Sequence, residues 1–273
     1  MCYKSVLTVL STAEGADAPL AQVAALADVF DAHAEALCLG VDRTQTGYYY
    51  AGANALVLQE TLARAEEEAA LAETYAEQQL RAAGMPFSTE TGLAQIADIG
   101  RHVARRARFS DLVVLGQPYG AAKRAEAAPI VEAALFEARA PVLVVPDEAT
   151  PLRRPTTVLL AWNESMEAMA AIRHALPFLQ AAELVRLVVI EPPQHSPERS
   201  DPGGMLAQML ARHGVTCEID VLSKTLPRVS DVLNRHATDT AADLIVMGLA
   251  ALTRFREAIL GGATRTMLEQ AKL

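Results

Sequence analysis

The sequence predicts an α/β protein built from two copies of one doubly wound domain. Short apolar runs alternate with longer amphipathic segments, and one pattern of aspartate, apolar run and glycine occurs twice. With 273 residues the chain suits two ordinary cores better than one large one. Hydrophobic residues make up 51% of the chain and aromatic residues only 5%. That balance favours helices packed on buried parallel strands over an aromatic-cored sandwich.

The first half alternates strands and helices, as βαβ units require. Apolar runs of strand length are predicted at residues 5–10, 36–41, 87–91, 111–115 and 141–145. Amphipathic segments predict helices at residues 18–32, 54–83 and 95–108, and a further helix that ends near Arg139. Gly84 is a natural stop for the long, charged second helix.

The second half follows the same plan. Strands are predicted at residues 157–162, 184–190, 216–222 and 243–247, and helices at 165–179, 205–213, 229–240 and 262–271. Nothing after the last helix corresponds to strand 141–145, so the second copy is expected to lack the last strand. Its fourth strand would then lie at an edge that must be covered or paired.

The duplication is visible in the residues themselves. Residues 109–116, FSDLVVLG, match residues 241–248, AADLIVMG, with Asp before and Gly after the apolar run in both halves. Residues 146–155 contain three prolines and several charges, which is typical of a linker. We therefore expect a first domain at 1–146, a linker at 147–155 and a second domain at 156–273.

The composition excludes several partners and sites. A net charge of −9 disfavours nucleic acid and anionic membranes, although a small nucleotide can still bind a locally positive site. The three cysteines are far apart and the six histidines lack metal-binding spacing, so neither a disulfide framework nor a metal cluster is expected. No apolar run has the length of a membrane span, and the first residues lead directly into a strand without room for a signal peptide. A reducing, cytoplasmic location follows as the expectation.

One loop in the second half has the chemistry of an anion site. A strand ends at Gly248, a loop follows, and the turn Gly261-Gly262-Ala263-Thr264 opens a helix. Glycines let the backbone approach a ligand closely, and the first N–H groups of a helix lack partners at its positive end. Thr264 can add a hydroxyl donor.

At these residues the chain resembles the universal stress protein family. That family has a pattern of glycine, two residues, glycine, nine residues, then glycine and a small residue. Gly248 and Gly261 hold the first and third glycine positions, Ala251 replaces the second, and Gly262 is the small residue. Residues 160–165, 167–179, 243–248, 18–34 and 141–145 are also similar to family segments, so the resemblance covers nearly the whole chain.

The resemblance implies a flavodoxin-like layout with parallel strand order 3-2-1-4-5 and a role in stress adaptation and signalling. It implies no defined reaction, and members of the family either bind ATP or have lost nucleotide binding. The ligand expected here is ATP, ADP or AMP. Carried over to this sequence, the adenine wall would be Ala161, Asn163 and Val189. The phosphate cradle would be Gly248, Gly261, Gly262, Ala263 and Thr264.

The sequence departs from the family pattern at three places in the second half: Asn163 stands where Asp is usual, Ala251 replaces glycine, and Glu164 replaces a glycine near the pocket mouth. The first half departs further, because residues 116–120 keep glycines at altered spacing and residues 127–131 lack the Gly-Gly turn. We therefore expect a nucleotide only in the second half.

Two other functions stay open. The chain could be a ligand-free interaction or dimerisation scaffold in which both nucleotide sites are degenerate, with its two domains paired with each other or in a homodimer. It could also be a slow ATP hydrolase, although it has no Walker lysine. Ser165 is expected to be a helix N-cap rather than a nucleophile, because no Gly-x-Ser-x-Gly elbow surrounds it. The three tyrosines of the loop at residues 48–50 could stack on a ligand or a partner, but we expect this loop to pack on its own domain.

Overall fold

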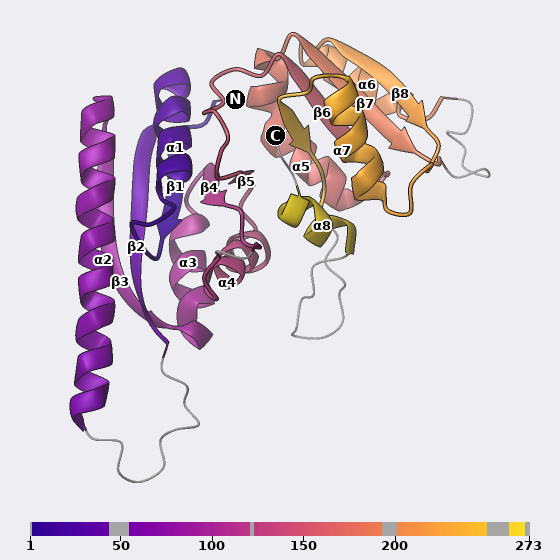
Figure 1. Cartoon of the computed structure of the whole chain (residues 1–273). Coiled ribbons are helices and arrows are strands. Elements are labelled where there is room, and N and C mark those ends of the chain that lie inside the picture. The colour runs from indigo at the N-terminus through magenta and orange to yellow at the C-terminus, as the bar shows by residue number, and fades with distance from the viewer. Residues whose placement is uncertain (1, 44–54, 121–122, 193–200, 250–261, 271–273) are drawn as a thin grey trace. The chain divides into compact units, whose positions relative to one another are not determined.

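A computed structural model describes residues 2–43, 55–120, 123–192, 201–249 and 262–270. The chain divides into two compact units, Tyr3–Pro151 and Leu152–Leu273 together with Met1–Cys2 (Figure 1). Each unit is built around one parallel sheet. The limits predicted for the linker, 147–155, stay a prediction.

The first unit contains a five-stranded parallel sheet in the order β3-β2-β1-β4-β5. Its strands are β1 (Ser5–Leu10), β2 (His33–Asp42), β3 (Phe87–Gln95), β4 (Leu112–Gly116) and β5 (Val142–Val145). Its helices are α1 (Asp17–Phe30), α2 (Ala55–Ala83), α3 (Ile99–Ala107) and α4 (Ala127–Glu132), which continues into a π-helical turn at Ala133–Glu137. The predicted doubly wound order 3-2-1-4-5 is confirmed.

The second unit repeats the arrangement with four strands in the order β8-β7-β6-β9. Its strands are β6 (Thr157–Trp162), β7 (Leu184–Ile190), β8 (Cys217–Leu222) and β9 (Leu244–Val246). Its helices are α5 (Met166–Ala181), α6 (Gly204–Arg212), α7 (Val229–Asp239) and α8 (Gly262–Gln270). In the described part of this unit no strand pairs with the outer side of β9, so the second sheet has fewer strands, as expected.

Several element boundaries differ from those predicted, most clearly at the start of β2, the end of β3 and the start of α3. Helix α1 ends before Asp31, whose φ of 49° is left-handed, so β2 starts at His33 instead of residue 36. Strand β3 continues to Gln95 because it pairs with β2 along its whole length. A short 3₁₀ turn then delays α3 until Ile99. The polar residues of β3 concealed its length, since this strand lies at the sheet edge.

The repeated aspartate has the same structural role in both units. The Asp111 carboxylate accepts hydrogen bonds from the backbone N–H groups of Lys4 at 2.7 Å and Ser5 at 3.0 Å. The Asp243 carboxylate accepts from Thr156 and, at 3.0 Å, from Thr157. Each aspartate therefore joins the start of the fourth strand of its sheet to the start of the first.

Helix α2 lies directly against β2, as Figure 1 shows. A Cβ atom on Gly40 would lie 2.1 Å from the backbone oxygen of Ala65, so only glycine allows this approach. The buried side of the helix consists mainly of small residues: Ala65, Ala69, Ala72, Ala76 and Leu80. This close packing brings the part of α2 around Ala65 to the carboxyl end of β2.

Equivalent positions of the two sheets have opposite charge. Glu35 of β2 pairs in register with Leu7, and Arg186 of β7 pairs with Leu159, the residue that matches Leu7 in the repeat. In the first sheet Arg106 of α3 approaches Glu35 at 3.4 Å. The helix that covers this position therefore supplies a positive charge.

The second sheet reverses this arrangement. Arg186 itself supplies the positive charge and lies 3.2 Å from the carboxylate of Asp220 on β8. His236 of α7 places Nε2 2.8 Å from the same carboxylate. In each sheet the charged strand residues therefore contact a side chain from the helix that covers that sheet, Arg106 of α3 in the first and His236 of α7 in the second.

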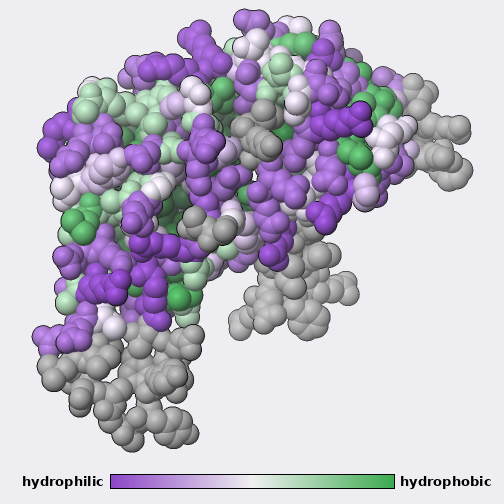
Figure 2. All heavy atoms as spheres, in the orientation of Figure 1, coloured by the Kyte–Doolittle hydropathy of each residue, from purple (hydrophilic) through white to green (hydrophobic). Residues whose placement is uncertain are grey.

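Most large exposed apolar side chains in the described part of the chain are isolated, but Ile219 and Val221 lie on one face of the edge strand β8. Phe109, Met166 and Met205 are among the most exposed, at 81%, 80% and 75%. On the face drawn in Figure 2, hydrophobic residues lie among hydrophilic ones. Isolated exposed apolar residues are normal on a protein surface and do not indicate a docking site.

Candidate functional site

The predicted nucleotide site lies at the carboxyl edge of the second sheet, where β6, β7 and β9 end. Gly248 follows β9, and Gly262, Ala263 and Thr264 form the first turn of α8. Gly261 and Ala251 lie outside the described residues, as do Tyr48, Tyr49 and Tyr50 of the first half. In an open α/β sheet, ligands bind at the carboxyl ends of strands where the strand order reverses.

Asn163 takes part in capping α5. Its Oδ1 accepts hydrogen bonds from the Ser165 hydroxyl at 2.7 Å and from the Ser165 backbone N–H at 3.2 Å. The Ser165 hydroxyl oxygen in turn accepts from the backbone N–H of Ala168 at 3.1 Å. The prediction that Ser165 is a helix N-cap is therefore confirmed, and the amide nitrogen of the exposed Asn163 is the part left for a ligand.

The two apolar residues of the predicted adenine wall lie on different strands and different faces. Ala161 pairs with Val188, and Trp162 pairs with Val189. Because successive side chains of a strand alternate between faces, Ala161 and Val189 point to opposite sides of the sheet. Trp162 lies on the face of Val189, and its indole N–H is buried without a hydrogen-bond partner among the described residues. It was not selected from the sequence.

Backbone geometry explains two residues of the motif region. A Cβ atom on Gly248 would lie 2.3 Å from the backbone nitrogen of Ala168, so glycine is needed there to pack the end of β9 against α5. Glu164 has a left-handed φ of 61°, a conformation that favours glycine. Thus Gly248 has a packing role whether or not a ligand binds, and Glu164 has a backbone conformation that glycine adopts more readily.

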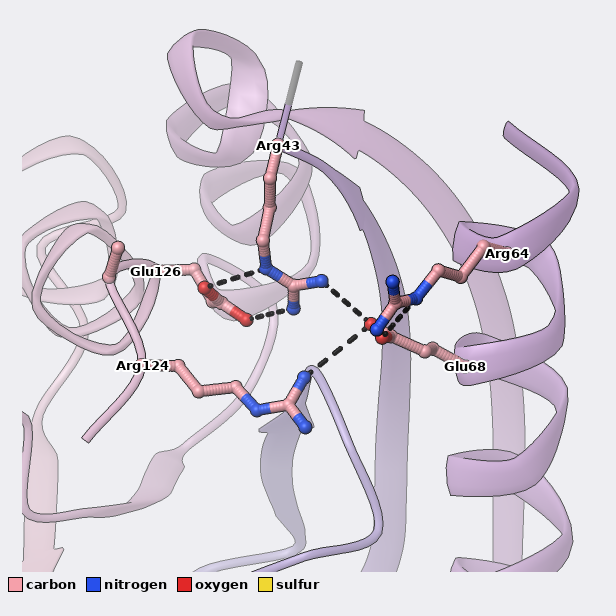
Figure 3. A pocket seen from close by; sticks show the side chains of 6 residues that line it. Arg43, Arg64, Glu68, Arg124 and Glu126 are labelled. Carbon is pink, nitrogen blue, oxygen red and sulfur yellow. Dashed lines mark hydrogen bonds and ion pairs between the residues drawn. The ribbon is translucent and has the colours of Figure 1, made fainter. Parts of the chain in front are cut away.

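A pocket with a cavity volume of about 370 Å³ lies in the first unit (Figure 3). It is lined by residues after β2, on α2 and just before α4: Arg43, Arg64, Glu68, Arg124, Ala125 and Glu126. The close approach of α2 to β2 at Gly40 brings the two α2 side chains next to Arg43. The pocket is therefore at the carboxyl edge of the first sheet, where the chain leaves β2.

Arg43 is the central residue of this pocket. It donates through Nη2 to Glu126 at 2.6 Å and through Nη1 to Glu68 at 2.8 Å. The Glu68 carboxylate also lies 3.5 Å from a guanidinium nitrogen of Arg124 and 3.6 Å from one of Arg64. Figure 3 shows the guanidinium groups of all three arginines directed toward this one carboxylate.

The electrostatics of Glu126 follow from its position. Its side chain is fully buried, and burial alone would raise the pKa of the carboxyl group. The hydrogen bond and charge of Arg43, its own backbone N–H and the hydroxyl of Ser11 outweigh burial and hold that pKa below the usual value. The same contact, led by the hydrogen bond to Glu126, raises the pKa of Arg43. Both groups are therefore ionised at neutral pH.

None of these pocket residues was selected from the sequence, because they lie far apart along the chain and each is typical of a solvated surface charge. A signal was nevertheless present. Arg43 follows the second strand and Arg124 precedes a helix, and both of these positions lie at the carboxyl edge in a doubly wound domain. An arginine at each of them is the sequence signal for this charged cluster.

Other chemistry is limited in the described part of the chain. No group of three or more His, Cys, Asp or Glu side chains there could hold a metal ion. None of Cys2, Cys38 and Cys217 forms a disulfide, and burial together with the charge of Glu73 raises the pKa of Cys38 to about 12. None of the described helices combines the length and apolar character needed to cross a bilayer.

The fold defines a class of protein in which two flavodoxin-like α/β domains follow each other in one chain. No family model and no curated protein matches the sequence. Among solved structures, a universal stress protein from Archaeoglobus fulgidus DSM 4304 is similar at a TM-score of 0.67 and 14% identity, covering 98% of this chain and 96% of that one. A putative universal stress protein from Pseudomonas aeruginosa UCBPP-PA14 is similar at a TM-score of 0.58 and 17% identity, covering 97% and 89%. A functionally unknown protein from Pseudomonas aeruginosa PAO1 is similar at a TM-score of 0.56 and 17% identity, covering 97% of this chain and 89% of that one. The chain therefore has the fold of a tandem universal stress protein.

Proposed function

We propose that this protein acts in stress response and signalling, and that its second domain binds ATP or a related nucleotide, ADP or AMP. The observation that carries the proposal is a fold shared over nearly the whole chain with a tandem universal stress protein, combined with the glycine pattern from Gly248 to Gly262. We further propose that the protein works in the cytoplasm, with its domains paired within one chain or in a homodimer.

The physical basis of nucleotide binding is the start of α8. Gly261 and Gly262 immediately precede Ala263 and Thr264, and the helix that begins at Gly262 has nine residues. Its first backbone N–H groups and its dipole favour the phosphates. The amide of Asn163 at the end of β6 can donate to the adenine or ribose.

Catalysis is not part of this proposal. Rapid phosphoryl transfer needs a positioned nucleophile and groups that neutralise the developing charge. Ser165, the hydroxyl nearest the end of β6 along the chain, caps α5. Any ATP hydrolysis is therefore expected to be slow.

Isothermal titration of the full chain with ATP, ADP and AMP tests nucleotide binding. Gly261→Asp places a carboxylate among the phosphate donors, so it should abolish the heat of binding. The melting temperature of the variant without nucleotide should equal that of the wild type, which separates lost binding from lost folding. Absence of heat with the wild-type protein, together with a melting temperature that nucleotide does not change, would discard the proposal.

A second candidate is a scaffold without ligand, favoured by the contacts of Asn163. Its Oδ1 is engaged by Ser165, and the side chains of Ala161 and Val189 face opposite sides of the sheet. In this function the second domain would present a surface rather than a pocket. Nucleotide released from purified protein on denaturation, detected by mass spectrometry, would reject the scaffold.

A further inference from the structure

We propose that the first domain has an anion site of its own, in which Arg43, Arg64 and Arg124 bind the phosphate of a small polar phosphate ester. This site is separate from the nucleotide site proposed for the second domain. It is formed by arginine side chains instead of a glycine loop.

The charges of the pocket favour an anion. Among the described lining residues, three guanidinium groups face the two carboxylates of Glu68 and Glu126, and the third carboxylate that reaches them, Glu14, is largely exposed to solvent. The walls of a concave site focus this field, so a local positive potential can attract an anion to an acidic protein. Guanidinium groups also match the geometry of phosphate oxygens.

The carboxylates do not satisfy the arginines. Glu126 is fully buried and is held by Arg43. Glu68 is then shared by all three arginines, at 2.8 Å from Arg43 but only 3.5 Å from Arg124 and 3.6 Å from Arg64. Arg124 also reaches Glu14 at 3.4 Å, and that carboxylate is 88% exposed. Each guanidinium has several N–H donors, so Arg64 and Arg124 keep donors for a ligand.

The size and lining of the pocket indicate the kind of ester. A cavity of about 370 Å³ lies in the range of small-molecule sites and has room for an organic group beside the phosphate. Ala125 is the only apolar residue among the described lining residues, and none of these residues is aromatic. The described lining is therefore almost entirely charged, which suits a polar ester. Glu68 can accept hydrogen bonds from hydroxyl groups, which favours a polyol or sugar phosphate.

The first experiment measures the melting temperature and the heat of binding of the full chain with inorganic phosphate and with glycerol 3-phosphate. Sodium chloride and sodium sulfate at matched ionic strength serve as references. Both phosphate probes should raise the melting temperature above the chloride value, and the ester should bind more tightly than phosphate or sulfate. Equal melting temperatures in phosphate and chloride would overturn the site, and equal affinities for the ester and sulfate would overturn the choice of ligand.

Arginine variants locate the binding. The double variant Arg64→Gln with Arg124→Gln should weaken glycerol 3-phosphate binding at least fivefold. Arg81→Gln is the matched control, since Arg81 is 69% exposed on the same helix and lies about 25 Å away along its axis. Equal loss in the control and the double variant would contradict the proposal.

A change of opposite sign provides the sharper test. Glu68→Gln removes the carboxylate that competes for the guanidinium groups, so phosphate should bind several-fold more tightly. Glu77→Gln, on the same helix, should leave phosphate binding unchanged. A purely structural role of Glu68 would lower stability without improving binding, and this result would overturn the proposal.

The two proposed sites are distinguished by Gly261→Asp. This variant should lose nucleotide binding and keep the response to glycerol 3-phosphate. If it loses the phosphate response as well, the phosphate binds in the second domain and the first-domain site is refuted.

Discussion

Arg43 donates a hydrogen bond to Glu126 at 2.6 Å, and the carboxylate that accepts it is completely buried. The arginine itself is 35% exposed and also donates to Glu68. The pair is therefore asymmetric. The glutamate depends on Arg43 for its counter-charge, whereas the guanidinium has a second carboxylate and water.

This asymmetry predicts unequal effects of two neutralising substitutions. Arg43→Gln leaves a buried carboxylate without its counter-charge and should reduce the free energy of unfolding at pH 7 by about 3 kcal/mol. Glu126→Gln leaves a partly exposed guanidinium that still pairs with Glu68, so its effect should be about 1 kcal/mol. Urea unfolding measures both values. A larger loss for Glu126→Gln would contradict the asymmetry.

The lowered pKa of Glu126 predicts a defined pH dependence. A carboxyl group whose pKa is lower in the folded state stabilises the fold above its unfolded pKa, and this stabilisation is lost as the pH falls through the folded value. The stability difference between wild type and Glu126→Gln should be constant above about pH 5. It should then shrink as the pH falls below the ordinary carboxyl value of 4.5. Thermal melts of both proteins between pH 7 and pH 3 provide the measurement, and a difference that does not vary with pH would refute the shift.

The repeated aspartates predict similar losses in the two units. Asp111→Ala and Asp243→Ala each remove a carboxylate that accepts two backbone N–H groups at the start of the first strand. Each substitution should lower the free energy of unfolding of its own unit by about 1–2 kcal/mol, because these hydrogen bonds are charge-assisted but partly exposed. Hydrogen exchange of the Ser5 and Thr157 amides can follow each unit separately. Unchanged exchange at Ser5 in Asp111→Ala would show that the contact contributes nothing.

Gly116 at the end of β4 and Gly248 after β9 differ in the space available for a Cβ atom. Gly116→Ala should be nearly neutral, since a Cβ atom there would meet only Pro19 at 3.6 Å. Gly248→Ala should reduce stability by about 2 kcal/mol, because the new methyl would overlap the backbone of α5 at Ala168. Melting temperatures of the two variants without ligand give the comparison. If both are neutral, Gly248 is not a packing residue.

Glu164 predicts a stabilising substitution. Its left-handed backbone is strained for any residue with a Cβ atom, so Glu164→Gly should raise the free energy of unfolding by about 0.5–1 kcal/mol. Glu164→Ala keeps the strain and should give no comparable gain. Urea unfolding at pH 7 compares the two variants, and equal stabilities would mean that the charge of Glu164 is responsible rather than its conformation.

Much of the fold could be predicted because its central strands are buried apolar runs with clear ends. The observed bounds of β1, β6 and β7 agree with those predicted. Strand β3 was predicted too short because a polar strand at a sheet edge lacks this pattern, and its length is set by pairing with β2. Local sequence does not contain that information.

The pocket of the first domain could not be predicted for a related reason. Arg43 and Glu126 are 83 positions apart, and their contact depends on a fold that places the end of β2 beside the start of α4. The contact between Glu68 and Arg43 also depends on Gly40, because only glycine at this position allows α2 to pack closely against β2. Each side chain alone is indistinguishable from an ordinary surface charge.

The opposite charges of Glu35 and Arg186 affect how a duplicated chain folds. Tandem copies of one module can exchange equivalent segments and misassemble during synthesis. If α3 covered the second sheet, Arg106 would face Arg186 and two positive charges would meet at a partly buried position. The reversal thus makes the hybrid electrostatically unfavourable and favours the pairing of each sheet with its own helix, although both halves share one topology.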